Sequence, residues 1–415
     1  MDVYNLGTGS GIYLDNNSTT QIDPKVIEAM MPYLSTYYGN ASSQHGFGLP
    51  VDKAIARARE QVADLLGAQY PDEIIFTSCA SESDNTALWS SLWSQKGKDE
   101  IITTDVEHPA IMQTCAFLES HGVKVHYLQV NKKGDLDVDE YKSLLNERTA
   151  LCSIMWANNE TGNIYPVPEL ARLAHERGIM FHTDAVQAVS KVDINLRETD
   201  INMLSFSGHK IHAPKGIGVL YVRRGTRFVP FMKGGHQERG RRAGTENVPY
   251  IVGLGVACEL AKQHLGEVNT RIKAMRDRLE AGILKSIPEC FVTGDPDNRT
   301  ANTLNVAFKY VEGEAILLLL NEYGIAASSG SACSSESLEP SHVMRAMGVP
   351  FSAAHGTIRF SLSRFNTDAD VDKTLEVLPG VIAHLRELSP YWKQNKPQLT
   401  NIDHDFDASS TEVRA

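Results

Sequence analysis

Short apolar runs alternate with helical patterns over the first two thirds of the chain. Runs with the length and composition of buried strands cover residues 72–77, 100–104, 123–128, 150–156, 179–183, 201–205 and 218–222. Helical patterns at 82–93, 109–120 and 170–177 lie between them. This alternation predicts an α/β fold with a mainly parallel sheet that helices cover on both faces.

The pattern changes after about residue 265. Long helical stretches at 269–287 and 367–388 bracket shorter strands at 303–309 and 357–361. This change predicts a smaller α+β domain that follows the larger α/β domain.

We therefore expect a large domain over residues 18–264 and a small domain over 265–394. Residues 1–17 are expected to join the small domain, because a short N-terminal strand cannot pack alone. Residues 395–415 are polar and acidic without periodicity, which predicts a flexible tail.

Composition and charge narrow the class of protein. The 415 residues carry a formal net charge of −11, whereas a nucleic-acid-binding surface is normally basic. No apolar run approaches the roughly 20 residues of a membrane span, and the N-terminal segment lacks the basic and apolar regions of a signal peptide. The six cysteines show no C-x-x-C spacing, so we expect reduced thiols in the cytoplasm.

Lys210 is the first candidate catalytic residue. It lies in SFSGHKIHAPKG (205–216), a loop rich in serine, glycine and histidine that follows a predicted strand. A lysine in such a loop can act as a Schiff-base nucleophile. The alternative is a solvated surface lysine.

Asp184 and His108 also follow predicted strands, and open α/β sheets bind ligands at the carboxyl edge of their strands. A carboxylate there can keep a pyridine nitrogen protonated, and a histidine can stack on a planar cofactor and move protons. The alternatives are an N-cap aspartate and an ordinary loop histidine. A metal site at His182 and Asp184 would need a third ligand at fitting spacing, which the sequence lacks.

The strand-to-helix turn TSCASESDN (77–85) is a candidate phosphate site. Small polar residues at a helix N-terminus leave backbone N–H groups open to an anion. The alternative is a capping box with Ser81 or Ser83 as the cap. The glycine run at 7–11 is not a dinucleotide fingerprint, because position 12 is Ile12 and the run precedes a strand.

Cys333 differs from the other five cysteines, which lie in apolar or helical contexts typical of the core. Its segment, SSGSACSSES (328–337), contains six serines and a glycine, so no apolar side chain anchors the loop. We expect its thiol to be accessible and able to swing. The alternative is an ordinary loop cysteine.

Together these segments resemble the cysteine desulfurases, class V of the fold-type-I pyridoxal-phosphate enzymes. The matching stretches keep the family order and spacing up to about residue 393: YLDNNSTT (13–20), FTSCASESDN (76–85), EHPA (107–110), NNETG (158–162), HTDAVQ (182–187), SFSGHK (205–210), RAGTEN (242–247), SSGSACSSESLEPSHVMRAMG (328–348) and IRFSLSRF (358–365). GGHQERGRRAGTEN and EGEAILLLLN are most similar to the nitrogen-fixation branch, NifS, ahead of the housekeeping branch, IscS.

The resemblance implies pyridoxal 5'-phosphate as cofactor and a role for each matching residue. Lys210 would bind the cofactor and move the Cα proton, Asp184 would pair with the pyridine nitrogen, and His108 would stack on the ring. The remaining implied contacts are Gln187 to the phenolic oxygen, Ala80, Ser81, Ser207, Gly208 and His209 around the phosphate, Asn159 to cofactor and substrate, and Arg359 to the substrate carboxylate. Thr245 would reach the phosphate in the neighbouring subunit's site, which implies a homodimer.

The resemblance also implies a reaction. Sulfur would leave L-cysteine, giving L-alanine and a persulfide on Cys333. The sulfur would pass to a scaffold protein that builds iron–sulfur clusters for nitrogenase, and the persulfide would bring Cys333 into contact with that metal cluster.

Three other functions stay open. A class-V aminotransferase would share the fold without needing Cys333, and a selenocysteine lyase would share both. A non-catalytic sulfur carrier or scaffold is a different class of protein, and Lys210, Asp184 and His108 speak against it.

Overall fold

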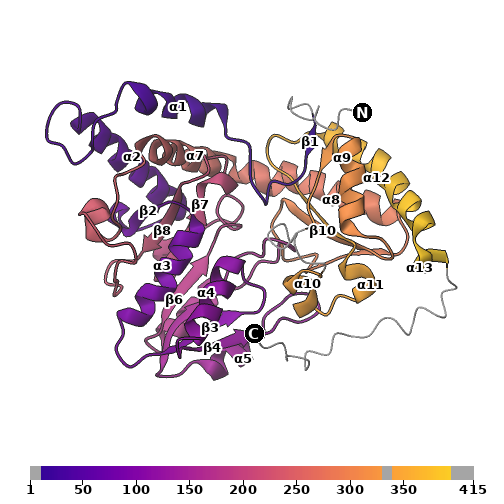
Figure 1. Ribbon diagram of the computed structural model, residues 1–415, viewed down its shortest axis with the longest axis horizontal. Helices are drawn as coiled ribbons and strands as arrows, with labels where there is room; N and C mark the ends of the chain where they lie inside the picture. Colours follow the sequence, from indigo (N-terminus) through magenta and orange to yellow (C-terminus); the bar gives the residue numbers. More distant parts are fainter. Residues whose placement is uncertain (1–10, 330–338, 394–415) are drawn as a thin grey trace.

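The computed structural model describes residues 11–329 and 339–393, which form a larger and a smaller lobe side by side (Figure 1). A seven-stranded sheet lies in the larger lobe. Its order is β2 (Ile74–Thr77), β8 (Gly218–Val222), β7 (Met203–Ser207), β6 (Met180–Asp184), β5 (Thr149–Ser153), β3 (Glu100–Thr104) and β4 (Lys124–Leu128). Strand β8 runs antiparallel to both its neighbours, and the other pairs are parallel. The predicted α/β fold with a mainly parallel mixed sheet is confirmed.

Helices cover both faces of this sheet (Figure 1). One face packs against α3 (Ala80–Trp93) and α4 (Pro109–Glu119). The core on the other face includes residues of α2 (Leu49–Leu66), α6 (Val167–His175) and α7 (Val248–Glu267), and α1 (Pro24–Ser35) packs against α7. Helix α5 (Val138–Leu144) follows β4. Successive residues of β2 serve opposite faces: Ile75 joins the α3 and α4 cluster, whereas Ile74 and Phe76 join the other.

The smaller lobe has its own apolar core. Strands β12 (Thr357–Ser361), β10 (Thr303–Phe308) and β9 (Cys290–Val292) form an antiparallel sheet, and β1 (Ile12–Tyr13) pairs with β11 (Ile325–Ala326). Its helices are α8 (Lys273–Ser286), α9 (Gly313–Glu322), α10 (His342–Ala346), α11 (Phe351–Ala354), α12 (Asp368–Leu388) and α13 (Pro390–Lys393). Leu14 packs in this core, whereas Val343 and Met344 of α10 pack in the core of the larger lobe. The predicted domain boundaries stay a prediction.

Helix α7 is the longest of several helices, α1 and α2 among them, that the hydrophobic pattern did not predict. It runs through a π turn, Val268–Ile272, directly into α8, so one continuous helical rod crosses residue 265. Its buried residues include both large and small side chains, such as Leu254, Gly255 and Cys258, instead of a narrow stripe of large ones. None of the helices in the described ranges has the length and apolar composition needed to cross a membrane.

Candidate active site

A cavity of about 750 Å³ lies where the carboxyl ends of the central strands meet the smaller lobe. The sequence-predicted residues that line it are Ala80, Ser81, His108, Asn159, Asp184, Gln187, Ser207, His209, Lys210 and Arg359. They come from segments far apart in the chain, because parallel strands end at the same edge of a sheet.

Lys210 ends a short 3₁₀ turn, Gly208–Lys210, directly after β7. Its Nζ donates to the backbone carbonyls of Asn17 and Ser18, each at 2.6 Å. The side chain is partly buried in the cavity wall, so the surface-lysine alternative is wrong. Gly208 begins this turn and packs closely against Ile217. A Cβ at this position would lie 2.8 Å from Cγ2 of Ile217, so the turn leaves little room for a side chain there.

Asp184 ends strand β6, and its Oδ1 accepts the N–H of Val186 at 2.9 Å. Burial raises the pKa of this carboxyl group, while His108 and Lys210 nearby act in the opposite direction. Residues 185–190 form turns, so Asp184 is not the N-cap of a following helix. The Asp184 carboxylate therefore faces a cavity that the cationic side chains of Lys210 and Arg359 also line.

His108 caps helix α4 through its ring, because its Nδ1 accepts the N–H of Ala110 at 3.1 Å. An accepting Nδ1 carries no proton, so the remaining ring nitrogen is the donor. Burial lowers the pKa of His108, which also favours the neutral imidazole. A neutral, buried ring of this kind can stack on a planar ligand in the cavity.

The N-terminus of α3 opens toward the same cavity through Ala80 and Ser81. Cys79 precedes the helix without a side-chain cap, and Ser81 and Ser83 lie inside it, so the capping-box alternative is wrong. Ser207 and His209 line the cavity as well, and burial lowers the pKa of His209 to about 4. Uncapped N–H groups beside neutral hydrogen-bonding side chains suit an anion such as a phosphate.

Arg359, on strand β12, brings a buried guanidinium from the smaller lobe. Its side chain donates to Asp15 Oδ1 at 2.9 Å, to Ser18 Oγ at 2.7 Å and to the Asn159 carbonyl at 2.8 Å. These contacts fix the orientation of the Arg359 guanidinium, whose parallel N–H groups can donate to the two oxygens of a carboxylate.

Two predicted site residues among those that the structure describes, Gly208 and Thr245, do not line this cavity. Thr245 lies in a separate pocket of about 160 Å³. Neighbouring Arg242 is tied to Glu82 of α3 at 2.8 Å, which keeps that segment beside the helix. Cys333 lies outside the described residues.

The structure adds cavity residues that the sequence reasoning missed. Asn17 and Ser18 act through backbone carbonyls, which have no signature in the sequence beyond their place in YLDNNSTT. Asp84 and Glu160 are buried carboxylates in the cavity wall, and burial raises the pKa of both. Both lie in segments that carry the resemblance, which was the available signal. Within residues 11–329 and 339–393, no group of three or more His, Cys, Asp or Glu could hold a metal ion.

Comparison with known proteins agrees with this geometry. Residues 12–374 match the model of the aminotransferase class-V family. The chain is 61% identical to a cysteine desulfurase of Gluconacetobacter diazotrophicus over 92% of this chain and 96% of that one. It is 59% identical to cysteine desulfurase NifS of Azotobacter vinelandii over 93% and 96%.

Solved structures give the same result. A NifS-like protein superimposes with a TM-score of 0.85 at 38% identity, over 90% of this chain and all of that one. A NifS-like protein from Rickettsia africae gives a TM-score of 0.80 at 29% identity, over 90% and 99%. The chain therefore belongs to the cysteine desulfurases of the aminotransferase class-V family.

Proposed function

We propose that this protein binds pyridoxal 5'-phosphate in the 750 Å³ cavity and takes sulfur from L-cysteine. The observation that supports this best is the meeting of Lys210, Asp184, His108 and Arg359 in that cavity. A class-V aminotransferase would need the same cavity, so the distinction depends on Cys333. Assays of the protein with L-cysteine and with L-selenocysteine distinguish a cysteine desulfurase from a selenocysteine lyase.

The residues present fit the cofactor. Asp184 would hold the pyridine nitrogen, His108 would stack on the ring, and Gln187 would face the phenolic oxygen. The uncapped end of α3 with Ser207 and His209 would hold the phosphate. When bound, pyridoxal phosphate supplies an electron sink for the charge that develops at the substrate Cα.

Lys210 would bind the cofactor and take the Cα proton of L-cysteine. Its two carbonyl contacts hold Nζ at the cavity wall, where a proton acceptor is needed. Arg359 and Asn159 would hold the substrate carboxylate and so present the Cα–H bond to Lys210.

The sulfur step would belong to Cys333. Its thiolate attacks the substrate sulfur, an S–S bond forms, and the C–S bond breaks with its electron pair left on the substrate carbon. That carbon takes up a proton, so L-cysteine and the Cys333 thiol become L-alanine and a Cys333 persulfide. The persulfide sulfur would then pass to an iron–sulfur scaffold protein in the cytoplasm, for nitrogenase maturation.

Arg359→Ala tests the carboxylate site. Losing a charged hydrogen-bond partner costs roughly 1.5–3 kcal/mol, so KM for L-cysteine should rise about tenfold to a hundredfold. Steady-state alanine formation measures this. Asp15→Asn is the control, because it removes the ion pair at 2.9 Å but leaves the guanidinium. An unchanged KM in Arg359→Ala would remove Arg359 from the substrate site.

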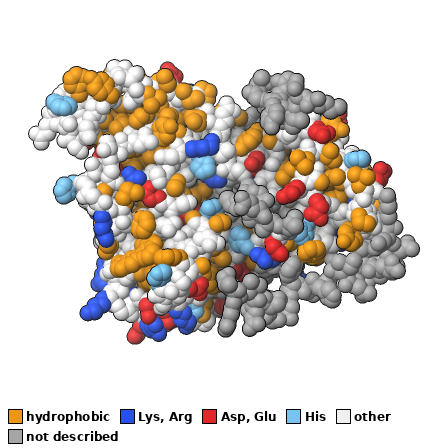
Figure 2. Space-filling model, viewed as in Figure 1, with side chains coloured by type: hydrophobic (Ala, Val, Ile, Leu, Met, Phe, Trp, Pro, Cys, Tyr) orange, Lys and Arg blue, Asp and Glu red, His pale blue; other side chains and the backbone are white. Residues whose placement is uncertain are grey.

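We also propose a homodimer in which Thr245 completes the neighbouring site. Apolar side chains gather on the exposed face of the larger lobe (Figure 2). One aromatic cluster on this lobe consists of Trp93 at 59% exposure, with Phe117 and Phe231 at 47% each, and all three rings contact Trp89. An exposed aromatic cluster of this kind is typical of a subunit interface.

Mixing two inactive variants tests this sharing of sites. Lys210→Ala and a bulky replacement, Thr245→Trp, should each be inactive alone. A hybrid dimer keeps one intact site, with Lys210 from one subunit and Thr245 from the other, so a refolded equal mixture should regain about a quarter of wild-type activity. Sedimentation velocity checks that all samples are dimers. An active monomer, or a mixture that stays inactive, would contradict the shared site.

A further inference from the structure

Lys191 is a lysine buried beside the candidate active site, and the reaction described above does not use it. Only 8% of the residue is exposed. It lies at the end of the turn that follows Asp184 and contains Gln187. Ser190, the preceding residue, has a φ of 72°, a left-handed conformation that is costly for serine. The chain therefore accepts local strain in the turn that leads to this side chain.

A chain of hydrogen bonds joins Lys191 to the cavity. Its Nζ donates to Gln187 Oε1 at 3.0 Å, and Gln187 Nε2 donates to the Asn17 carbonyl at 3.0 Å. The same carbonyl accepts Nζ of Lys210 at 2.6 Å. Gln187 lines the cavity, whereas Lys191 does not line it and contacts the oxygen of the Gln187 amide.

The chemistry of the two groups gives this contact one orientation. A lysine ammonium has donors and no acceptor, so it can meet only the oxygen end of the glutamine amide. The nitrogen end must then point toward Asn17 and the cavity. If the amide turned over, its NH₂ group would face the ammonium and its oxygen would face the Asn17 carbonyl, so both contacts would be lost.

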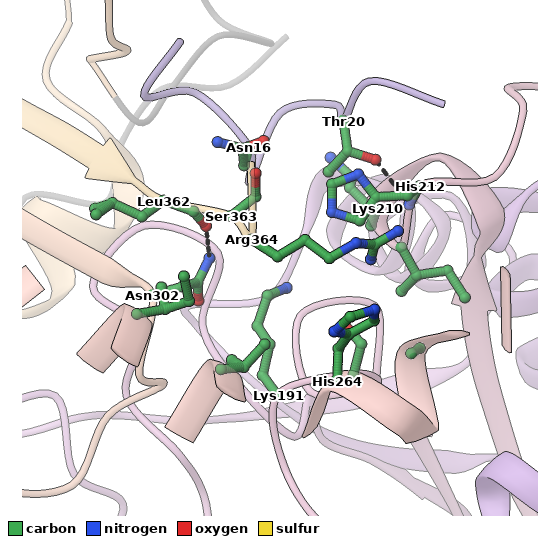
Figure 3. Close-up of a pocket in the computed structure, with 15 residues that line it drawn as sticks. Asn16, Thr20, Lys191, Lys210, His212, His264, Asn302, Leu362, Ser363 and Arg364 are labelled. Atoms are coloured by element: carbon green, nitrogen blue, oxygen red, sulfur yellow. Dashed lines mark hydrogen bonds between the residues drawn. The ribbon is translucent and has the colours of Figure 1, made fainter. Parts of the chain in front are cut away.

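The surroundings of Lys191 do not favour its charge. The charged groups that act on it, Lys210 and Arg359, are cations, and burial with these neighbours lowers the pKa of Lys191 to about 7. Figure 3 shows Lys191 and Arg364 reaching into a small pocket of about 40 Å³, with His264 at its edge. No acidic residue in the described part of the chain acts on Lys191, and burying a cation without a counter-ion costs stability, so folding alone does not explain this lysine.

We infer that Lys191 is a positioning residue that locks the Gln187 amide with its N–H₂ end toward the cavity. A donor then faces an anionic oxygen of the bound ligand. The inference rests on the proposed function, in which that oxygen is the phenolic oxygen of pyridoxal phosphate. Without Lys191 only the Asn17 carbonyl orients the amide, so the amide turns over more readily and can present an acceptor to the same oxygen.

Cofactor binding to the apo-protein tests this with Lys191→Met, which keeps the length of the side chain but removes the donor. Titration with pyridoxal phosphate, followed by protein fluorescence, should give a Kd about tenfold higher than wild type. Lys191→Arg keeps a charged donor and can extend into the 40 Å³ pocket, so its Kd should stay near wild type. Lys285→Met, at an exposed lysine of α8, is the control and should change nothing.

The unfolding temperature of the apo-proteins separates positioning from a structural role. Lys191→Met should unfold at or above the wild-type temperature, because it removes a buried, uncompensated cation. Gln187→Glu gives a second test that does not depend on Lys191→Met: it keeps an acceptor for Lys191 but removes the amide donor, so its Kd should also rise.

Each outcome decides between the proposals. A wild-type protein that does not bind pyridoxal phosphate would overturn the proposed function and this inference with it. Normal wild-type binding with an unchanged Kd in Lys191→Met or in Gln187→Glu would overturn the inference alone. So would a Lys191→Met protein whose unfolding temperature falls together with its affinity.

Discussion

Lys210→Ala is expected to abolish formation of alanine and sulfide from L-cysteine. The variant loses both the group that would bind the cofactor and the group that would take the Cα proton. General acid–base catalysis alone contributes about 10²–10⁴-fold, so we expect a loss of more than about 10³-fold. The variant should also lack the absorption band near 400 nm that we expect of the wild type, although cofactor can still bind through its phosphate contacts.

Lys215 provides the matched control, because it lies in the same loop but is exposed. Lys215→Ala should keep both the absorption band and the activity. Borohydride reduction followed by peptide mapping should place the cofactor on Lys210. A label on Lys215 or Lys191 would contradict the assignment.

Cys333→Ala is expected to stop alanine release while leaving the earlier steps intact. The thiolate is needed only for cleavage of the C–S bond, whereas cofactor binding and Cα proton removal would belong to Lys210, Asp184 and His108. The variant should therefore be yellow, should still change its spectrum on addition of L-cysteine, and should form no alanine. Stopped-flow absorbance with an alanine assay measures both halves of this result.

The other cysteines serve as controls. Burial raises the pKa of Cys115 and of Cys152 to about 12, so these thiols carry little thiolate at neutral pH. Cys79 lines the cavity and is the sharper control, because it is near the chemistry. Cys79→Ala should keep its activity, and loss of turnover there instead of in Cys333→Ala would move the sulfur carrier to Cys79.

The hydrophobic pattern predicted the strands better than the helices. The predicted bounds at 100–104, 218–222 and 357–361 are those of β3, β8 and β12. These strands are short, and polar residues or glycines lie close to both ends, so their limits are sharp in the sequence. Helix α7 was missed because its buried surface is built from large and small residues together, and a pattern search looks for a stripe of large ones.

The site was predictable only where side chains act. Lys210, Asp184 and His108 follow strand ends, and the resemblance to a family adds Arg359 from a distant segment. The carbonyls of Asn17 and Ser18 were not predictable, because every residue has such a group and only the fold selects these two. Lys191 follows Gln187 by four residues, and its burial is visible only in the fold, where it lines a small pocket with Ala261 and His264 of α7.

The most direct test of the whole account is the mass of the protein's cysteine peptides after reaction with L-cysteine in the absence of a reductant. Wild-type protein should gain the mass of one sulfur atom on the peptide that contains Cys333, with one equivalent of alanine released per site. Cys333→Ala should gain none. Added sulfur on Cys79 or Cys115, or a Cys333→Ala protein that releases sulfide at the wild-type rate, would contradict the persulfide mechanism.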